Sequence, residues 1–145
     1  MSKTILASKD DASGAAVERR KRILFADDHE DTRTMMTLWL GLSGYDVTTA
    51  GSVAETLPLT QSGSFDLLLL DGRYPDGCGV DLCKQIRGFD GKTPIVFVSG
   101  YAYPADIKKG LESGAQAYLS KPVDMNVLDG ILTELTGLAP VASRT

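Results

Sequence analysis

The 145-residue sequence has little of what extracellular, membrane or nucleic-acid-binding proteins usually carry. Its two cysteines, Cys78 and Cys83, and single histidine, His29, are too few for a disulfide framework or a zinc site. No apolar run is long enough to cross a membrane, and the N-terminus has no signal-peptide core. The net charge of -4 argues against a general nucleic-acid surface. We therefore expect a cytoplasmic protein that makes no direct contact with nucleic acid or membrane.

The composition is that of one globular domain, because 43% of the residues are hydrophobic and the length suits a single core. Residues 1–20 are small, polar and charged and predict a flexible N-terminal tail. Arg19 and Arg20 form a basic run with Lys21 and Arg22, which we interpret as a solvated lead-in to the first strand. The domain is expected over 21–138. Residues 139–145 would then be a short C-terminal tail, with no output domain.

Within that domain, short apolar strands alternate five times with amphipathic helical stretches. The expected strands are 22–27, 45–50, 65–71, 94–99 and 116–120. The expected helices are 30–43, 52–62, 79–88, 103–113 and 124–137. Five such repeats predict an α/β fold, in which helices cover both faces of a parallel sheet.

Several residues mark the ends of these helices. Gly44 ends the first helix, Ser52 and Glu55 suit a capping box for the second, and Asp124 suits the N-cap of the fifth. Pro58 falls inside the second helix, which should therefore be short, kinked or frayed. In the first helix Trp39 and the pair Met35-Met36 have the spacing of core residues.

Polar residues follow four of the five expected strands. Asp27 and Asp28 end the first, Asp71 the third, Ser99 the fourth and Lys121 the fifth. Ligands of such sheets bind outside the carboxyl ends of the strands, where these residues would meet. Carboxylates are the ligands that magnesium prefers, and a carboxylate can also attack phosphorus. Each feature alone fits an ordinary turn, cap or loop, but together they predict a magnesium-dependent phosphoryl site.

The same residues carry a resemblance to a known family. The matching features are the acidic pair Asp27-Asp28, the segment from Asp71 to Gly79, the strand end Val98-Ser99-Gly100 and the sequence from Tyr118 to Pro122. In this order and spacing they resemble the receiver domain of two-component response regulators. The resemblance covers about residues 22–137. It implies a flavodoxin-like, doubly wound five-stranded parallel sheet of order 2-1-3-4-5 with five helices.

The resemblance also implies roles for individual residues. Asp71 would be the phosphoacceptor, with Ser99 and Lys121 contacting the phosphoryl group. The implied Mg²⁺ ligands are Asp27, Asp28, Asp71 and the backbone carbonyl of Arg73. Ser99 and Tyr118 would form the switch: Ser99 moves toward the phosphoryl group, and Tyr118 fills the vacated space from the surface. The Lys121-Pro122 bond is expected to be cis.

The implied function is a phosphorylation-switched signalling domain rather than an enzyme, although it would assist its own aspartyl phosphorylation and dephosphorylation. A histidine kinase or histidine phosphotransfer protein would supply the phosphoryl group, and an unknown protein would receive the signal. A homodimer through the fourth helix, fifth strand and fifth helix is possible. An unphosphorylated scaffold fits the intact site poorly. A haloacid-dehalogenase-type hydrolase needs a second Asp two residues after the nucleophile, where this chain has Arg73.

Three residues set this chain apart near the site. Tyr74 stands where the family usually has Met, which should change the packing of the loop but not the chemistry. Arg73 and Tyr101 flank the path of a hydrolytic water, and we expect them to shield a phosphorylated Asp71. The alternative is that Arg73 is a solvated loop residue paired with Asp76 or Glu30.

Overall fold

The computed structural model describes residues 19–138, in which five strands form one parallel sheet of order β3-β2-β4-β7-β8. The strands are β2 (Arg22–Ala26), β3 (Asp46–Ala50), β4 (Leu67–Leu70), β7 (Ile95–Ser99) and β8 (Ala117–Ser120). Counted along the chain, this is the order 2-1-3-4-5. The predicted flavodoxin-like, doubly wound fold is therefore confirmed.

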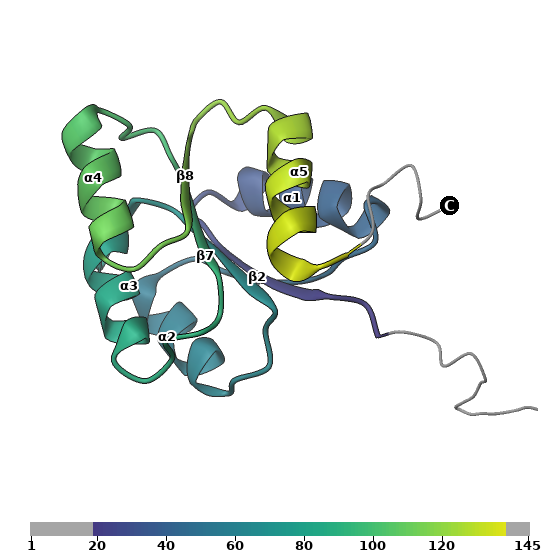
Figure 1. Cartoon of the computed structure of the whole chain (residues 1–145), viewed down its shortest axis with the longest axis horizontal. Coiled ribbons are helices and arrows are strands. Elements are labelled where there is room, and N and C mark those ends of the chain that lie inside the picture. Colours follow the sequence, from purple (N-terminus) through teal and green to yellow (C-terminus); the bar gives the residue numbers. More distant parts are fainter. Residues whose placement is uncertain (1–18, 139–145) are drawn as a thin grey trace, which may run out of the picture.

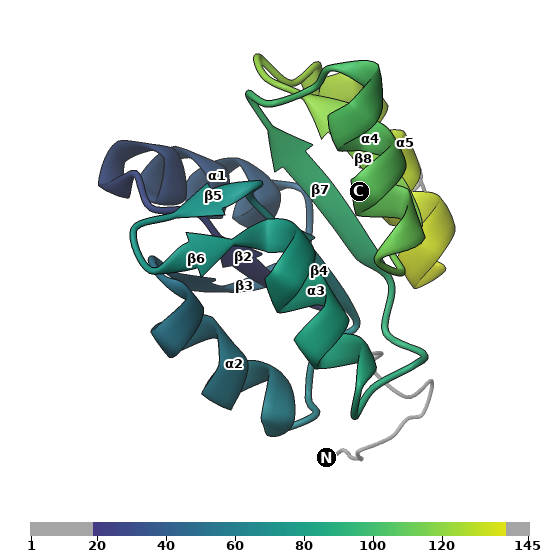
Figure 2. The same ribbon diagram turned by 90° about the vertical axis from the view of Figure 1, so that its left-hand side faces the viewer.

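Five helices cover the sheet in two layers, with α1 and α5 on one face and α2, α3 and α4 on the other (Figure 1, Figure 2). The helices are α1 (Glu30–Leu42), α2 (Val53–Gln61), α3 (Gly79–Arg87), α4 (Pro104–Glu112) and α5 (Met125–Thr136). Each lies within one or two residues of its expected range. Among residues 19–138, no helix combines the length and apolar character needed to span a bilayer.

The core has two parts, one on each face of the sheet, because successive side chains of a strand point in opposite directions. In β2, Ile23 and Phe25 pack under α1 and α5, whereas Leu24 and Ala26 pack under α2 and α3. The strand β4 is buried along its whole length, as expected of a parallel sheet covered on both sides. The two cores fix the sheet, and the sheet fixes the edge at which its strands end.

The expected helix ends are present with small differences. The Ser52 hydroxyl accepts the Glu55 N–H at 3.1 Å, and Asp124 accepts the N–H groups of Asn126 and Val127. The Glu55 carboxylate bonds to the N–H of Gly51 rather than Ser52, so the capping box is one residue out of register. The helix that contains Pro58 has nine residues.

One expectation about the first helix needs correction. Met36 is buried, but Met35 is exposed, so the helix turns only one member of the pair toward the core. After Asp71 the chain forms a two-stranded antiparallel hairpin of β5 (Arg73–Tyr74) and β6 (Gly77–Cys78).

The expected tails lie outside the described residues, apart from Arg19 and Arg20. Arg20 is not part of a free tail, because its guanidinium donates to the carbonyls of Gly41 and Gly44 at the end of α1. Arg19 likewise bonds to the carboxylate of Asp66.

Candidate functional site at the carboxyl ends of the strands

Two acids and a lysine meet where β2, β4 and β8 end. Lys121 Nζ lies 2.7 Å from Asp27 Oδ2 and 3.3 Å from Asp71 Oδ2. Backbone bonds hold these positions: Asp71 N–H donates to Ala26, Asp27 N–H to Ala50, and Lys121 N–H to Ser99. The Lys121-Pro122 bond is cis, as predicted. Residues separated by up to 94 positions in the chain thus share one hydrogen-bonded cluster.

Asp28 extends the cluster toward solvent. Asp27, Asp28 and His29 each offer a donor atom, and these atoms lie within 4.8 Å of one another. The His29 ring is 72% exposed and stands 3.2 Å from Asp28 Oδ1, while its backbone N–H donates to Asp27. His29 is thus an exposed residue at the start of α1. Asp71 joins the same site through Lys121, which it shares with Asp27.

The site carries more negative than positive charge, because Asp27 and Asp71 share one ammonium group and Asp28, beside Asp27, adds a third carboxylate. Burial raises the pKa of Asp71 above its usual 3.8, with Asp27 adding to this and Lys121 opposing it. Burial also acts against the charge on Lys121, but its bonds to Asp27 and Asp71 raise the pKa of the amine overall. A hard divalent cation with oxygen ligands would relieve the remaining repulsion.

A hydroxyl and a glycine complete the inner part of the site. Ser99 is fully buried at the end of β7, and its Oγ accepts the Tyr101 N–H at 3.0 Å. Gly72 lies so close that a Cβ at this position would collide with Ser99 Oγ. Its N–H donates to Asp71 Oδ1 at 2.6 Å. The glycine therefore lets the hydroxyl approach the loop and also orients the carboxylate.

Tyr118 takes a different position from the one expected. Its half-buried ring stacks on Phe97 with ring centroids 5.3 Å apart, and its hydroxyl donates to the Tyr101 carbonyl. The ring thus already lies inward beside α4, whereas we expected it to start from the surface. This contact of the ring with α4 is not visible in the sequence, because it depends on how closely α4 approaches β8.

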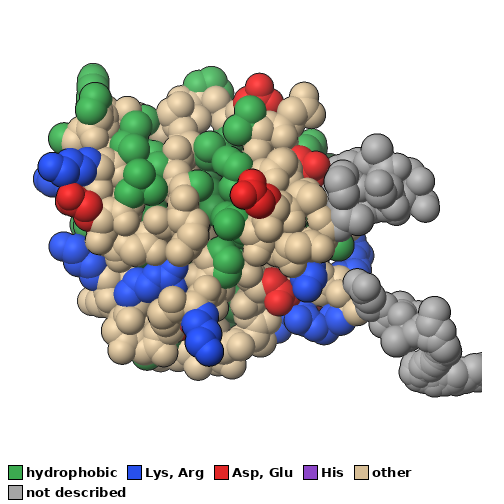
Figure 3. Space-filling view, in the orientation of Figure 1, with side chains coloured by type: hydrophobic (Ala, Val, Ile, Leu, Met, Phe, Trp, Pro, Cys, Tyr) green, Lys and Arg blue, Asp and Glu red, His purple; other side chains and the backbone are tan. Residues whose placement is uncertain are grey.

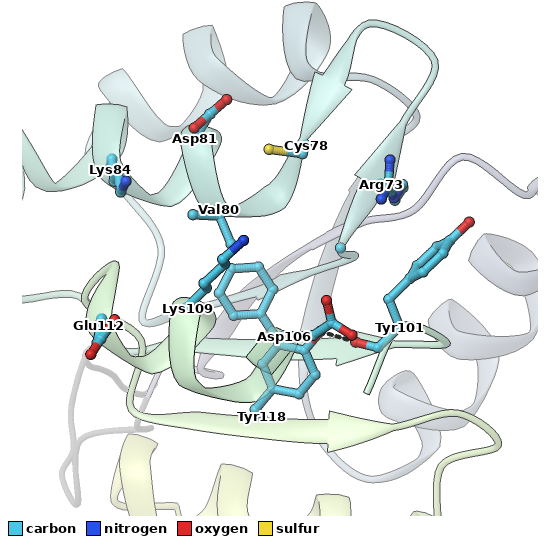
Figure 4. Close-up of a pocket in the computed structure, with 12 residues that line it drawn as sticks. Arg73, Cys78, Val80, Asp81, Lys84, Tyr101, Asp106, Lys109, Glu112 and Tyr118 are labelled. Carbon is cyan, nitrogen blue, oxygen red and sulfur yellow. Dashed lines mark hydrogen bonds between the residues drawn. The ribbon is translucent and has the colours of Figure 1, made fainter. Parts of the chain in front are cut away.

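A groove of about 610 Å³ between α3 and α4 opens beside these residues (Figure 4). Arg73 and Tyr101 form one of its rims, and the Arg73 guanidinium carbon lies 4.6 Å from the centre of the Tyr101 ring. Arg73 is thus stacked on an aromatic face rather than paired with Asp76. The Asp76 carboxylate instead accepts the N–H groups of Val53 and Ala54 at the start of α2.

Sequence reasoning did not assign Tyr74 a place in the site. The side chain is buried, and its hydroxyl accepts the Asp71 N–H at 2.8 Å and donates to the Ala26 carbonyl at 3.1 Å. Burial raises the pKa of Tyr74 well above 10, and the nearby carboxylates add to this, so the hydroxyl keeps its proton at neutral pH. The signal in the sequence was a tyrosine three residues after Asp71, which we expected to change only the packing of the loop.

Comparisons with known proteins point to one family. A family model described as the response regulator receiver domain matches residues 23–133. The response regulator PilR of Pseudomonas aeruginosa is 35% identical over 120 residues, which are 83% of this chain and 26% of PilR. The DNA-binding response regulator MtrA of Mycobacterium tuberculosis is 36% identical over 103 residues, 71% of this chain and 45% of MtrA. The chain thus spans less than half the length of these relatives.

Solved structures of response regulators share this fold. A two-component response regulator from Clostridium difficile superposes with a TM-score of 0.78 and 27% identity, covering 82% of this chain and 98% of that one. The non-phosphorylated HemR receiver domain from Leptospira biflexa gives a TM-score of 0.76 and 29% identity. That match covers 83% of this chain and 97% of the HemR domain.

Proposed function

The chain belongs to the response regulator receiver domain family, and from this premise we propose that Asp71 accepts a phosphoryl group in a two-component or phosphorelay system. The observation that carries the proposal is the placement of the Asp71 carboxylate, 3.3 Å from Lys121 Nζ and joined through it to Asp27. A carboxylate in this position is oriented, close to a cation and near enough to solvent for a phosphodonor to reach. Residues 21–138 form the receiver domain in this proposal.

Mg²⁺ fits the donor set. The three carboxylates provide hard oxygen ligands, and a single lysine leaves them with an excess of negative charge. Asp27, Asp28, Asp71 and the Arg73 carbonyl would hold the ion. When bound, it supplies positive charge to the oxygens of the phosphoryl group.

The transfer itself requires positioning more than covalent assistance. An oxygen of Asp71 forms a bond to phosphorus, while the bond from phosphorus to the donor's histidine nitrogen breaks and its electron pair leaves with that nitrogen. Gly72 N–H orients the carboxylate, and the Lys121 ammonium faces the oxygens that gain charge. The Ser99 hydroxyl accepts the Tyr101 N–H in this structure and would be a further donor to the phosphoryl oxygens.

The family is one of phosphoacceptor signalling domains, and we propose that this domain works by binding proteins rather than by catalysing a reaction on a separate substrate. A histidine kinase or histidine phosphotransfer protein would be the donor, and the family also supports a cytoplasmic location. Although MtrA is described as DNA-binding, we assign no nucleic-acid contact to residues 21–138.

Output would come from the face formed by α4, β8 and α5. Figure 3 shows hydrophobic side chains spread over this side of the molecule. Its exposed large apolar residues include Tyr103, Leu111 and Val127. An apolar face of this kind suits a downstream protein or a second copy of the chain.

The test is incubation with a small phosphodonor and Mg²⁺, followed by intact mass measurement. Wild type and the control Asp31→Asn, which changes an exposed acid on α1, should gain the mass of one phosphoryl group. Asp71→Asn should gain none. A phosphate-sized gain that persists in Asp71→Asn would refute the assignment.

A further inference from the structure

The buried hydroxyl of Tyr74 joins the ends of the two strands that carry the acids. It accepts the Asp71 N–H at 2.8 Å, and it donates to the Ala26 carbonyl at 3.1 Å. The same N–H also reaches the Ala26 carbonyl directly, at 3.0 Å. The hydroxyl therefore closes a small hydrogen-bonded ring where β2 and β4 are about to separate.

That ring involves the backbone of Asp71 itself and of the residue before Asp27. Their side chains are the two that share Lys121, at 3.3 and 2.7 Å. Like charges repel, so the two strand ends tend to spread apart, and the backbone bonds between them must resist this. The contact between Asp71 N–H and Ala26 is the last bond of this ladder, and Tyr74 reinforces it from inside the core.

From this geometry we infer that Tyr74 is a positioning residue, whose hydroxyl sets the separation of Asp27 and Asp71 and thereby the affinity for a divalent cation and the rate of phosphorylation. The inference deepens the proposed function and rests on it. Tyr74 touches neither the ion nor the phosphoryl group in this account. It acts only through the backbone to which both carboxylates are attached.

The competing explanation is that Tyr74 merely fills space. Its ring packs in the cluster beneath α3, with Leu70 and Leu82 among its members. The two explanations separate in Tyr74→Phe, which keeps the ring and removes the hydroxyl. If packing alone matters, this variant should behave as the wild type does. If the hydroxyl positions the strand ends, cation binding should weaken although the ring is still present.

The experiment compares wild type, Tyr74→Phe and the control Thr133→Val by Mg²⁺ titration, followed through backbone amide NMR signals. Thr133, on the opposite face of the sheet, has a buried hydroxyl with no hydrogen-bond partner among the described residues. Replacing a group that supports metal ligands typically weakens binding by about 10- to 100-fold. Because Tyr74 bonds to backbone rather than to ligand oxygens, we expect about 3- to 10-fold weaker Mg²⁺ binding in Tyr74→Phe.

Two further readouts complete the test. The Asp71 amide proton should change its chemical shift in Tyr74→Phe even without Mg²⁺, because it loses an acceptor, and the phosphorylation rate should fall by a similar factor. Thr133→Val should leave all three quantities unchanged. Tyr74→Met, which also lacks the hydroxyl, should show the same weakened binding and serves if Tyr74→Phe does not fold.

The outcomes distinguish the inference from the function on which it rests. If wild type is phosphorylated on Asp71 and a hydroxyl-free variant binds Mg²⁺ as tightly as wild type, the positioning role is refuted and the function stands. If wild type itself neither binds Mg²⁺ nor gains a phosphoryl group, both are refuted. Weaker binding in the Tyr74 variants alone supports the inference.

Discussion

Lys121 lies closer to Asp27 than to Asp71, with its Nζ 2.7 Å from the first carboxylate and 3.3 Å from the second. The closer partner is therefore Asp27, which is almost completely buried, rather than Asp71, which is proposed to react. Asp27 holds the ammonium group in place whatever happens at Asp71. The lysine can then face an incoming phosphoryl group without first losing its own anchor.

Lys121→Met should destabilise the protein, because it leaves Asp27 buried without its cation. Removing one partner of a buried pair costs about 3–5 kcal/mol, and partial exposure of Lys121 reduces this to about 1–3 kcal/mol. The pKa of Lys121 is raised, so its stabilisation is complete below the usual 10.5 and is lost as pH rises through the folded-state value. Chemical denaturation at pH 7 and pH 11 measures both effects. The exposed Lys108→Met is the control, and equal losses in the two variants would contradict the expectation.

Asp71→Asn should stabilise the protein at neutral pH in the absence of divalent cations. The pKa of Asp71 is raised above 3.8 by burial, so ionising this group favours the unfolded chain. Through Asp71 alone, wild type should be more stable in acid, where this carboxyl group is protonated. It should lose this extra stability as pH rises from below 3.8 through the folded-state pKa of Asp71. The variant should not, and the gap between their melting temperatures should disappear in acid.

Mg²⁺ should make wild type more stable than Asp71→Asn, which reverses their order without the ion. An ion that binds only the folded state stabilises it by about 1.4 kcal/mol at ten times its dissociation constant. Wild type should gain this increment and Asp71→Asn less, because the variant lacks one ligand. Melting curves with and without Mg²⁺ provide the measurement. A wild type whose melting temperature ignores millimolar Mg²⁺ would show that the acids hold no such ion.

The parts of this structure that the sequence predicted depend on local pattern. Polar residues that end apolar strands meet at one edge of any parallel sheet, so Asp27, Asp71 and Lys121 could be placed together without coordinates. The contacts that were not predicted depend on how deeply a side chain is buried. Whether the hydroxyl of Tyr74 reaches the Ala26 carbonyl depends on how closely the segment after Asp71 packs against the end of β2. The spacing of residues along the chain does not give that distance.

Gly110→Ala should expel Tyr118 from its inward position. A Cβ at residue 110 would lie 2.6 Å from the Tyr118 ring and 3.3 Å from Phe97. Although Ala is favoured over Gly inside a helix by about 1 kcal/mol, the ring must move to make room. Loss of the nuclear Overhauser contacts between Tyr118 and Phe97 would report this. Gly130→Ala in α5 is the control, because its Cβ would meet no atom within 4 Å and should only stabilise the helix. Unchanged Tyr118 signals in Gly110→Ala would refute the expectation.

The stacked pair at the rim of the α3–α4 groove bears on how long a phosphoryl group on Asp71 would last. The Arg73 guanidinium carbon lies 4.6 Å from the centre of the Tyr101 ring. Such a contact is worth about 0.5–1 kcal/mol at an exposed site. A guanidinium could speed hydrolysis by stabilising charge in the transition state. Held against the ring, however, it would bind phosphoryl oxygens in the ground state and obstruct water, and ground-state binding lowers no barrier.

Arg73→Ala should therefore shorten the lifetime of phosphorylated Asp71. The expected factor is about two- to fivefold, which is the lost Arg73–Tyr101 contact energy expressed as a change in rate. Arg73→Lys should shorten it almost as much, because lysine keeps the charge but not the planar group that lies on the ring. Lys84→Ala, which removes a cation from the same groove away from the Arg73–Tyr101 contact, should leave the lifetime unchanged. The decay of the phosphorylated mass after removal of the donor gives each rate. Slower decay in Arg73→Ala would mean that the arginine assists hydrolysis, and the shielding interpretation would then be wrong.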